Sequence, residues 1–185
     1  LFTPFLKLGV EHILIGYDHL LFLAGLLVAC RRFGSMLAII TSFTVAHSLT
    51  LGAATFDLVA LPSRIVEPLI AASILYVGVE NFVRKDADRM RWPLTFLFGL
   101  VHGFGFAGVL RELGIGGAGI GAAWPLLGFN LGVELGQLAI AAVALPALLY
   151  ARRFPRFEKI GLPVISGLVV AAGLCWTVER GRAVF

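Results

Sequence analysis

The stretch Gly9-Val-Glu-His-Ile-Leu-Ile-Gly-Tyr-Asp-His-Leu-Leu-Phe22 carries four ionisable side chains, Glu11, His12, Asp18 and His19, in an otherwise almost wholly apolar run. The run extends from Leu8 to Cys30, and one helix of these 23 residues would span about 30 Å of hydrocarbon. An unpaired charge in a membrane costs about 2.5 kcal/mol or more, so such residues usually face a bundle interior and mark a site. The spacing of His12 and His19 predicts two rings on one helix face, about 10 Å apart along its axis.

Composition indicates a membrane protein. The chain has 185 residues, of which 59% are hydrophobic and 14% charged, and its mean hydropathy is +0.94. Soluble domains carry nearer a quarter of charged residues. The net charge of +4 does not indicate a nucleic-acid partner, because the basic residues sit in short loops. The two cysteines form no CxxC pair and predict no disulfide framework.

The apolar segments predict an all-α fold, a polytopic helix bundle forming one transmembrane domain over residues 1–185. Since the chain begins with Leu rather than Met, we expect a fragment or a chain that has lost an upstream signal or domain. Six spans are expected, at about 8–30, 35–60, 63–83, 92–111, 122–150 and 160–180.

The Lys and Arg residues are distributed unevenly between the two sides of these spans. Five lie on one side: Lys7, Arg64, Arg111, Arg180 and Arg182. Ten lie in the loops after spans one, three and five: Arg31, Arg32, Arg84, Lys85, Arg89, Arg91, Arg152, Arg153, Arg156 and Lys159. The positive-inside rule then predicts that both termini are extracytoplasmic, in a protein of the bacterial inner membrane.

Counting depth along the expected spans places several polar residues at one level. His19, His47, His102 and Glu134 come out about 14 to 19 Å deep, on four different helices. These four residues and Asp18 are the expected central site. His12 and Glu67, about 6 Å deep, are the expected outer mouth.

Divalent-metal binding is the chemistry that this set indicates. Imidazole suits zinc, nickel, copper and iron, and a carboxylate such as Asp18 or Glu11 completes the shell or orients a ligating His. The alternative is that the histidines are interhelical hydrogen-bonding groups. Glu80 and Asn81, beside Arg84 at the end of the third span, are explained at least as well by a solvated, snorkelling pair as by a site.

At these residues the sequence resembles the HupE/UreJ family of small membrane proteins. The resemblance rests on His12-x5-Asp18-His19, supported by the segments 43–50, 98–107 and 129–137. It implies a nickel permease in which His12, Asp18 and His19 lie on the metal pathway. The element around His102 has Gly and Phe where the nickel-permease form has a second His and a Glu, which leaves the metal open.

Three functions remain open from the sequence. The first is a permease or delivery protein for a divalent transition metal, nickel, zinc or a similar ion. The second is an intramembrane zinc hydrolase that uses three histidines with Asp18 and Ser48. The third is a non-catalytic metal-binding subunit of a larger membrane complex, or a homo-oligomer. The expected partners are the lipid bilayer and the metal ion.

Overall fold

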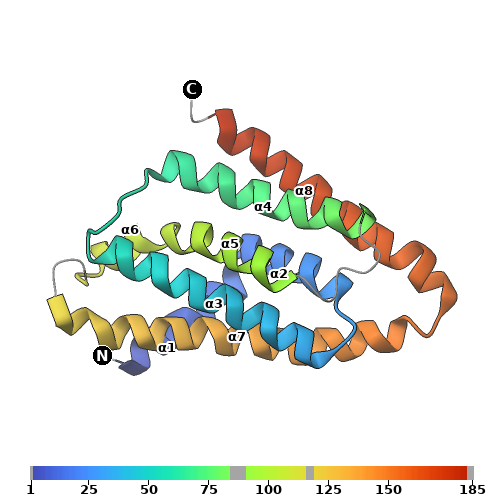
Figure 1. Cartoon of the computed structure of the whole chain (residues 1–185), viewed down its shortest axis with the longest axis horizontal. Coiled ribbons are helices and arrows are strands. Elements are labelled where there is room, and N and C mark those ends of the chain that lie inside the picture. Colours follow the sequence, from blue (N-terminus) through green and yellow to red (C-terminus); the bar gives the residue numbers. More distant parts are fainter. Residues whose placement is uncertain (1, 84–90, 116–118, 183–185) are drawn as a thin grey trace.

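The computed structural model describes residues 2–83, 91–115 and 119–182, and all regular elements in those ranges are helical (Figure 1). The helices are α1 (Phe2–Ile15), α2 (Tyr17–Ala29), α3 (Phe33–Thr55), α4 (Ser63–Val83), α5 (Arg91–Phe104), α6 (Ala107–Glu112), α7 (Ala123–Ala151) and α8 (Leu162–Arg182). A short 3₁₀ turn, η2 (Gly119–Ala122), precedes α7, and a π-helical turn, η3 (Phe157–Gly161), precedes α8. The expected all-α fold is confirmed.

Several of these helices are long and apolar enough to cross a membrane. Five candidate spans stand alone, and the bent pair α1 and α2 makes a sixth if it counts as one span. The protein is therefore an integral membrane protein. The second expected span, 35–60, ends earlier, at Thr55. The fourth, 92–111, is interrupted at Gly105 and Phe106, between α5 and α6.

The first expected span, 8–30, is not one straight helix, and that prediction was wrong. α1 and α2 meet at Gly16 with a bend of 69°. Gly16 is extended, with φ −73° and ψ 96°, so it leaves the helical path between its neighbours. A side-chain carbon at this position would collide with the backbone oxygen of His12 and with the His19 ring, so glycine suits the bend.

Glycines let the helices pack closely in pairs. α1 lies along α7, and α4 lies along α8 (Figure 1). A side-chain carbon on Gly132 of α7 would overlap the backbone oxygen of Leu6 in α1, and one on Gly9 of α1 would overlap the oxygen of Phe129. Backbones approach this closely in membranes where small residues face each other. The position of α1, and with it His12, therefore depends on α7.

Two apolar clusters fill the two halves of the bundle. The N-terminal cluster includes Ile13, Leu51 and Phe129, towards the end that carries the N-terminus, the end of α3 and the start of α7 (Figure 1). The opposite cluster includes Phe22, Phe43 and further residues of α2, α3, α4 and α7, towards the other end of the bundle. The histidines lie where these clusters meet.

A buried ion pair joins α4 and α5 in the half of the bundle that holds the opposite cluster. Arg91 and Glu80, 1% and 5% exposed, approach to 3.3 Å, and Arg91 donates to the side-chain oxygen of Asn81 at 2.7 Å. Of the two interpretations left open for Glu80 and Asn81, the solvated, snorkelling pair is therefore wrong, as is the placing of Arg91 in a loop. Arg84, Lys85 and Arg89 lie outside the described residues.

We expect Gly132→Ala to destabilise the protein, because the added carbon meets α1 backbone that cannot move aside locally. Overpacking of this kind costs about 1–3 kcal/mol. Thermal unfolding in detergent should show a lower midpoint than for the wild type. The matched control is Gly167→Ala in α8, where the added carbon meets nothing within 4 Å. Equal midpoints for both variants would contradict the packing described here.

Candidate metal site

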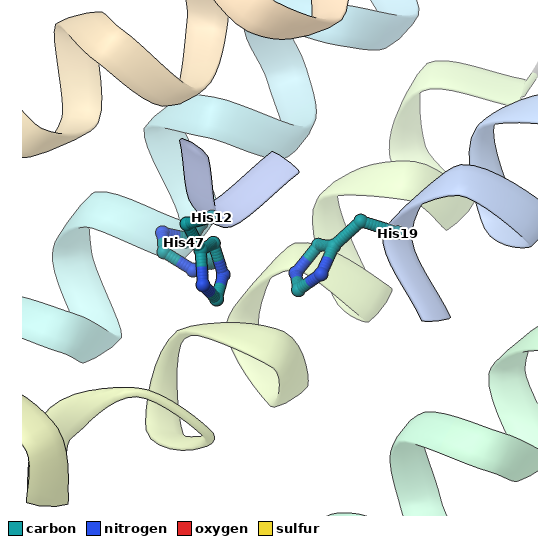
Figure 2. Close-up of side chains that lie close together, drawn as sticks. All are labelled: His12, His19 and His47. Atoms are coloured by element: carbon teal, nitrogen blue, oxygen red, sulfur yellow. The ribbon is translucent and has the colours of Figure 1, made fainter. Parts of the chain in front are cut away.

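Three histidines from three helices converge beside the bend at Gly16. His12 belongs to the last turn of α1, His19 to the first turn of α2, and His47 to the middle of α3. One ligand nitrogen from each residue lies within 4.8 Å of the other two. Figure 2 shows the three side chains gathered around a common space, with His19 approaching from the side opposite His12 and His47. We call these three residues the histidine triad.

The bend produces this convergence. The His12 and His19 ring centres lie 4.5 Å apart, against the roughly 10 Å expected for two turns of a straight helix. The expectation that His12 lies apart, at an outer mouth, was therefore wrong. His47 completes the group from α3, with its ring centre 6.4 Å from that of His12.

Each residue of the triad has a nitrogen without a hydrogen-bond partner. His47 is fully buried, His19 is 9% exposed, and the Nε2 atoms of both and of His12 are buried and unpartnered within the described part of the chain. Buried polar atoms in proteins are nearly always paired. Three unpaired ring nitrogens that face one space form a donor set that suits a metal ion.

Asn130 of α7 determines which nitrogen His47 presents. The Asn130 amide group donates to the backbone oxygen of Leu126 at 2.9 Å, so its side-chain oxygen faces Nδ1 of His47 at 3.2 Å. Because that oxygen can only accept, Nδ1 carries the hydrogen and Nε2 keeps its lone pair. This is the second-sphere arrangement that orients histidine ligands in metal sites.

Aromatic rings cover the triad on the side of the N-terminal cluster. Phe106, at the break between α5 and α6, stacks on Phe129 of α7 with ring centres 4.8 Å apart and planes 8° apart. The His12 ring centre lies 4.4 Å from that of Phe106 and 5.4 Å from that of Phe129. These apolar faces shield the ring nitrogens from other polar partners.

His102 lies beside the triad without belonging to it. Its ring centre is 5.3 Å from that of His19, and its Nε2 atom is 2.9 Å from the hydroxyl of Ser73. The structure therefore brings all four histidines into one neighbourhood, as depth counting predicted for three of them, and adds His12.

The carboxylates expected at the central site have other partners. Asp18 receives two hydrogen bonds from Arg180 of α8, at 3.0 and 3.1 Å. Glu134 accepts a hydrogen bond from Thr41 at 2.8 Å. Since Thr41 precedes His47 by six residues, this contact lies about 9 Å along α3 from His47. Neither carboxylate belongs to the triad's donor group.

The other two carboxylates considered from the sequence lie away from the triad. Glu67 is exposed on α4 and is not part of the donor group, so the expected mouth formed with His12 is not found. Glu11 pairs with Lys7 of its own helix at 3.4 Å.

Two polar residues near the histidines had weak or no sequence signals. Asn130 shares a polar face with Glu134 and Gln137 in the spacing of α7, which could have identified it. Ser73 had none, because a single serine in an apolar span most often bonds to its own helix.

Comparison with known proteins identifies the family of the chain. Neither the curated proteins nor the solved structures gave a match. A family model described as HupE / UreJ protein matches residues 1–180, nearly the whole chain. The chain belongs to the HupE/UreJ family.

Proposed function

We propose that this protein is a membrane permease for a divalent late first-row transition metal, with nickel or cobalt as the leading cargo. The observation that carries the proposal is the convergence of three unpaired imidazole nitrogens at a bend within a membrane-spanning pair of helices. The family's association with nickel and cobalt transport supports the same cargo.

The donor set supports this class of ion. Imidazole nitrogen binds nickel, cobalt, copper and zinc well, whereas magnesium and calcium require oxygen ligands. Three protein ligands leave coordination positions for water or for an incoming ligand. A permeating ion must bind and then leave, so an incomplete shell suits transport better than a closed one.

The bent first span also supports transport. Membrane transporters commonly build their ion sites from discontinuous helices, where the chain turns within the bilayer. Here His12 and His19 flank the bend, and a second break at Gly105 and Phe106 adjoins His12 through the Phe106 ring. In our proposal both termini are extracytoplasmic and the protein resides in the bacterial inner membrane, as the charge distribution predicts.

The zinc hydrolase alternative has less support from the site. Such an enzyme needs a general base or nucleophile beside the metal-bound water. The Ser48 hydroxyl donates to the backbone oxygen of Thr44 at 2.6 Å, and Asp18 is held by Arg180. Both side chains are therefore bonded elsewhere, and Asp18 lies outside the triad's donor group.

Purified protein loaded with nickel or cobalt should hold about one ion per chain, since three ligands and open positions form one site. Vesicles containing it should take up the ion, and His12→Ala, His19→Ala or His47→Ala should reduce both properties to near background. Mass spectrometry would measure bound metal, and a fluorescent indicator inside the vesicles would measure uptake. Cys175→Ser, which removes an exposed thiol, is the control and should behave as the wild type. Uptake no faster than in protein-free vesicles would refute the proposal.

Asn130→Leu should weaken metal binding about 10- to 100-fold, because His47 loses the acceptor that fixes its ring. Asn130→Asp retains an acceptor for Nδ1 and should bind the ion within a few-fold of the wild type. Competition titration with a chelator would measure both affinities. Wild-type affinity in Asn130→Leu would show that Asn130 does not orient the ligand.

A further inference from the structure

His102 lies beside the triad but has no role in it. It lies in the last turn of α5, is 2% exposed, and its ring is next to that of His19. Its other ring neighbours are Phe22 at 5.0 Å and Phe43 at 5.2 Å, both members of the opposite cluster. His102 therefore extends the row of histidines from the triad towards the other half of the bundle.

Ser73 of α4 sets the hydrogen on this ring. The Ser73 hydroxyl donates its one hydrogen to the backbone oxygen of Ile70 at 2.7 Å. Its oxygen is then free to accept from Nε2 of His102 at 2.9 Å. If the Ser73 hydroxyl instead donated to Nε2, the ring hydrogen would be on Nδ1. That buried N–H would have no acceptor, which costs more free energy than a lone pair without a donor.

The lone pair of His102 is consequently on Nδ1. That atom is buried and has no hydrogen-bond partner among the described residues. The aromatic neighbours of the ring are two phenylalanines and His19, and the phenylalanines offer Nδ1 no hydrogen. Histidines that bind metals likewise donate their other ring N–H to a neighbour, so Nδ1 of His102 is suited to bind a metal ion.

We propose that His19 and His102 form a second ion position, which receives the ion from the triad, and that Ser73 is its positioning residue. The inference rests on the proposed permease function. His19 belongs to both positions, and a neutral imidazole offers a single lone pair, so only one position is filled at a time. The ion keeps its bond to His19 while His12 and His47 are replaced by His102 and water.

The two positions differ in their number of ligands, and this difference favours release of the ion after transfer. The triad offers three imidazoles and the second position two, so the second holds the ion less tightly. An ion that moves along the row is therefore released more easily towards the opposite cluster. Binding that loosens along the path is what conduction through a selective site requires.

The test separates equilibrium binding from transport. His102→Ala should bind one equivalent of cobalt with the affinity of the wild type within about twofold, because the triad is intact. The same variant should take up cobalt into vesicles at least tenfold more slowly. Ser73→Ala should also keep the affinity and slow uptake about tenfold, as loss of a ligand's orienting partner typically does.

Two further variants show whether Ser73 acts through His102. The double variant Ser73→Ala/His102→Ala should be no slower than His102→Ala, and Ser73→Thr, which keeps the hydroxyl, should restore uptake. Ser48→Ala is the matched control, because its hydroxyl bonds only to its own helix at Thr44. Thermal midpoints of all variants identify any loss caused by unfolding.

Several outcomes would overturn the inference. Uptake by Ser73→Ala at the wild-type rate would show that Ser73 does not position His102. Slower uptake in the double variant than in His102→Ala would show that Ser73 acts by packing. Loss of equilibrium binding in His102→Ala would mean that four histidines form one site. In each of these three outcomes the wild-type protein still binds and takes up the ion, so only the second ion position is refuted. Failure of the proposed function would instead appear as absence of uptake by the wild type.

Discussion

The bend at Gly16 is the constraint on which the candidate metal site depends. A straight helix through this segment would hold His12 and His19 two turns apart, too far for a shared ligand. The bend turns the end of α1 and the start of α2 towards each other, and the two rings come within 4.5 Å between centres. A side chain at this position would strike the His12 carbonyl and the His19 ring, so the geometry of the site depends on the absence of one carbon atom.

Packing around the bend then orients the site. α1 is seated on α7 through glycines of both helices, and α7 supplies Asn130, which fixes the hydrogen on His47 of α3. The same glycine contacts that hold α1 in place thus also bring His12 to the ring that Asn130 orients. A change in α7 would act on two ligands of the triad at once.

The sequence was sufficient to predict the class of fold and that several histidines would lie close together. Hydropathy reports the length and lipid exposure of a segment, so the spans were found. It does not report where a glycine bends a helix: Gly9 and Gly25 remain inside helices, whereas Gly16 does not. The hydrogen-bond partners of the carboxylates could not be predicted from the sequence either. Asp18 pairs with Arg180, 162 residues away, a contact that only tertiary packing creates.

The Asp18–Arg180 pair keeps the carboxylate nearest in sequence to His19 out of the triad. The carboxylate next to His19 in the sequence is already balanced by a guanidinium, and the triad consists of imidazoles alone. In the proposed function, an ion with two positive charges would therefore cross without a counter-charge from the triad. The membrane voltage acts on such a charge with about 2.3 kcal/mol per elementary charge for each 100 mV. Transport that moves no second ion would then be electrogenic, and a voltage negative on the inside would favour entry of the ion.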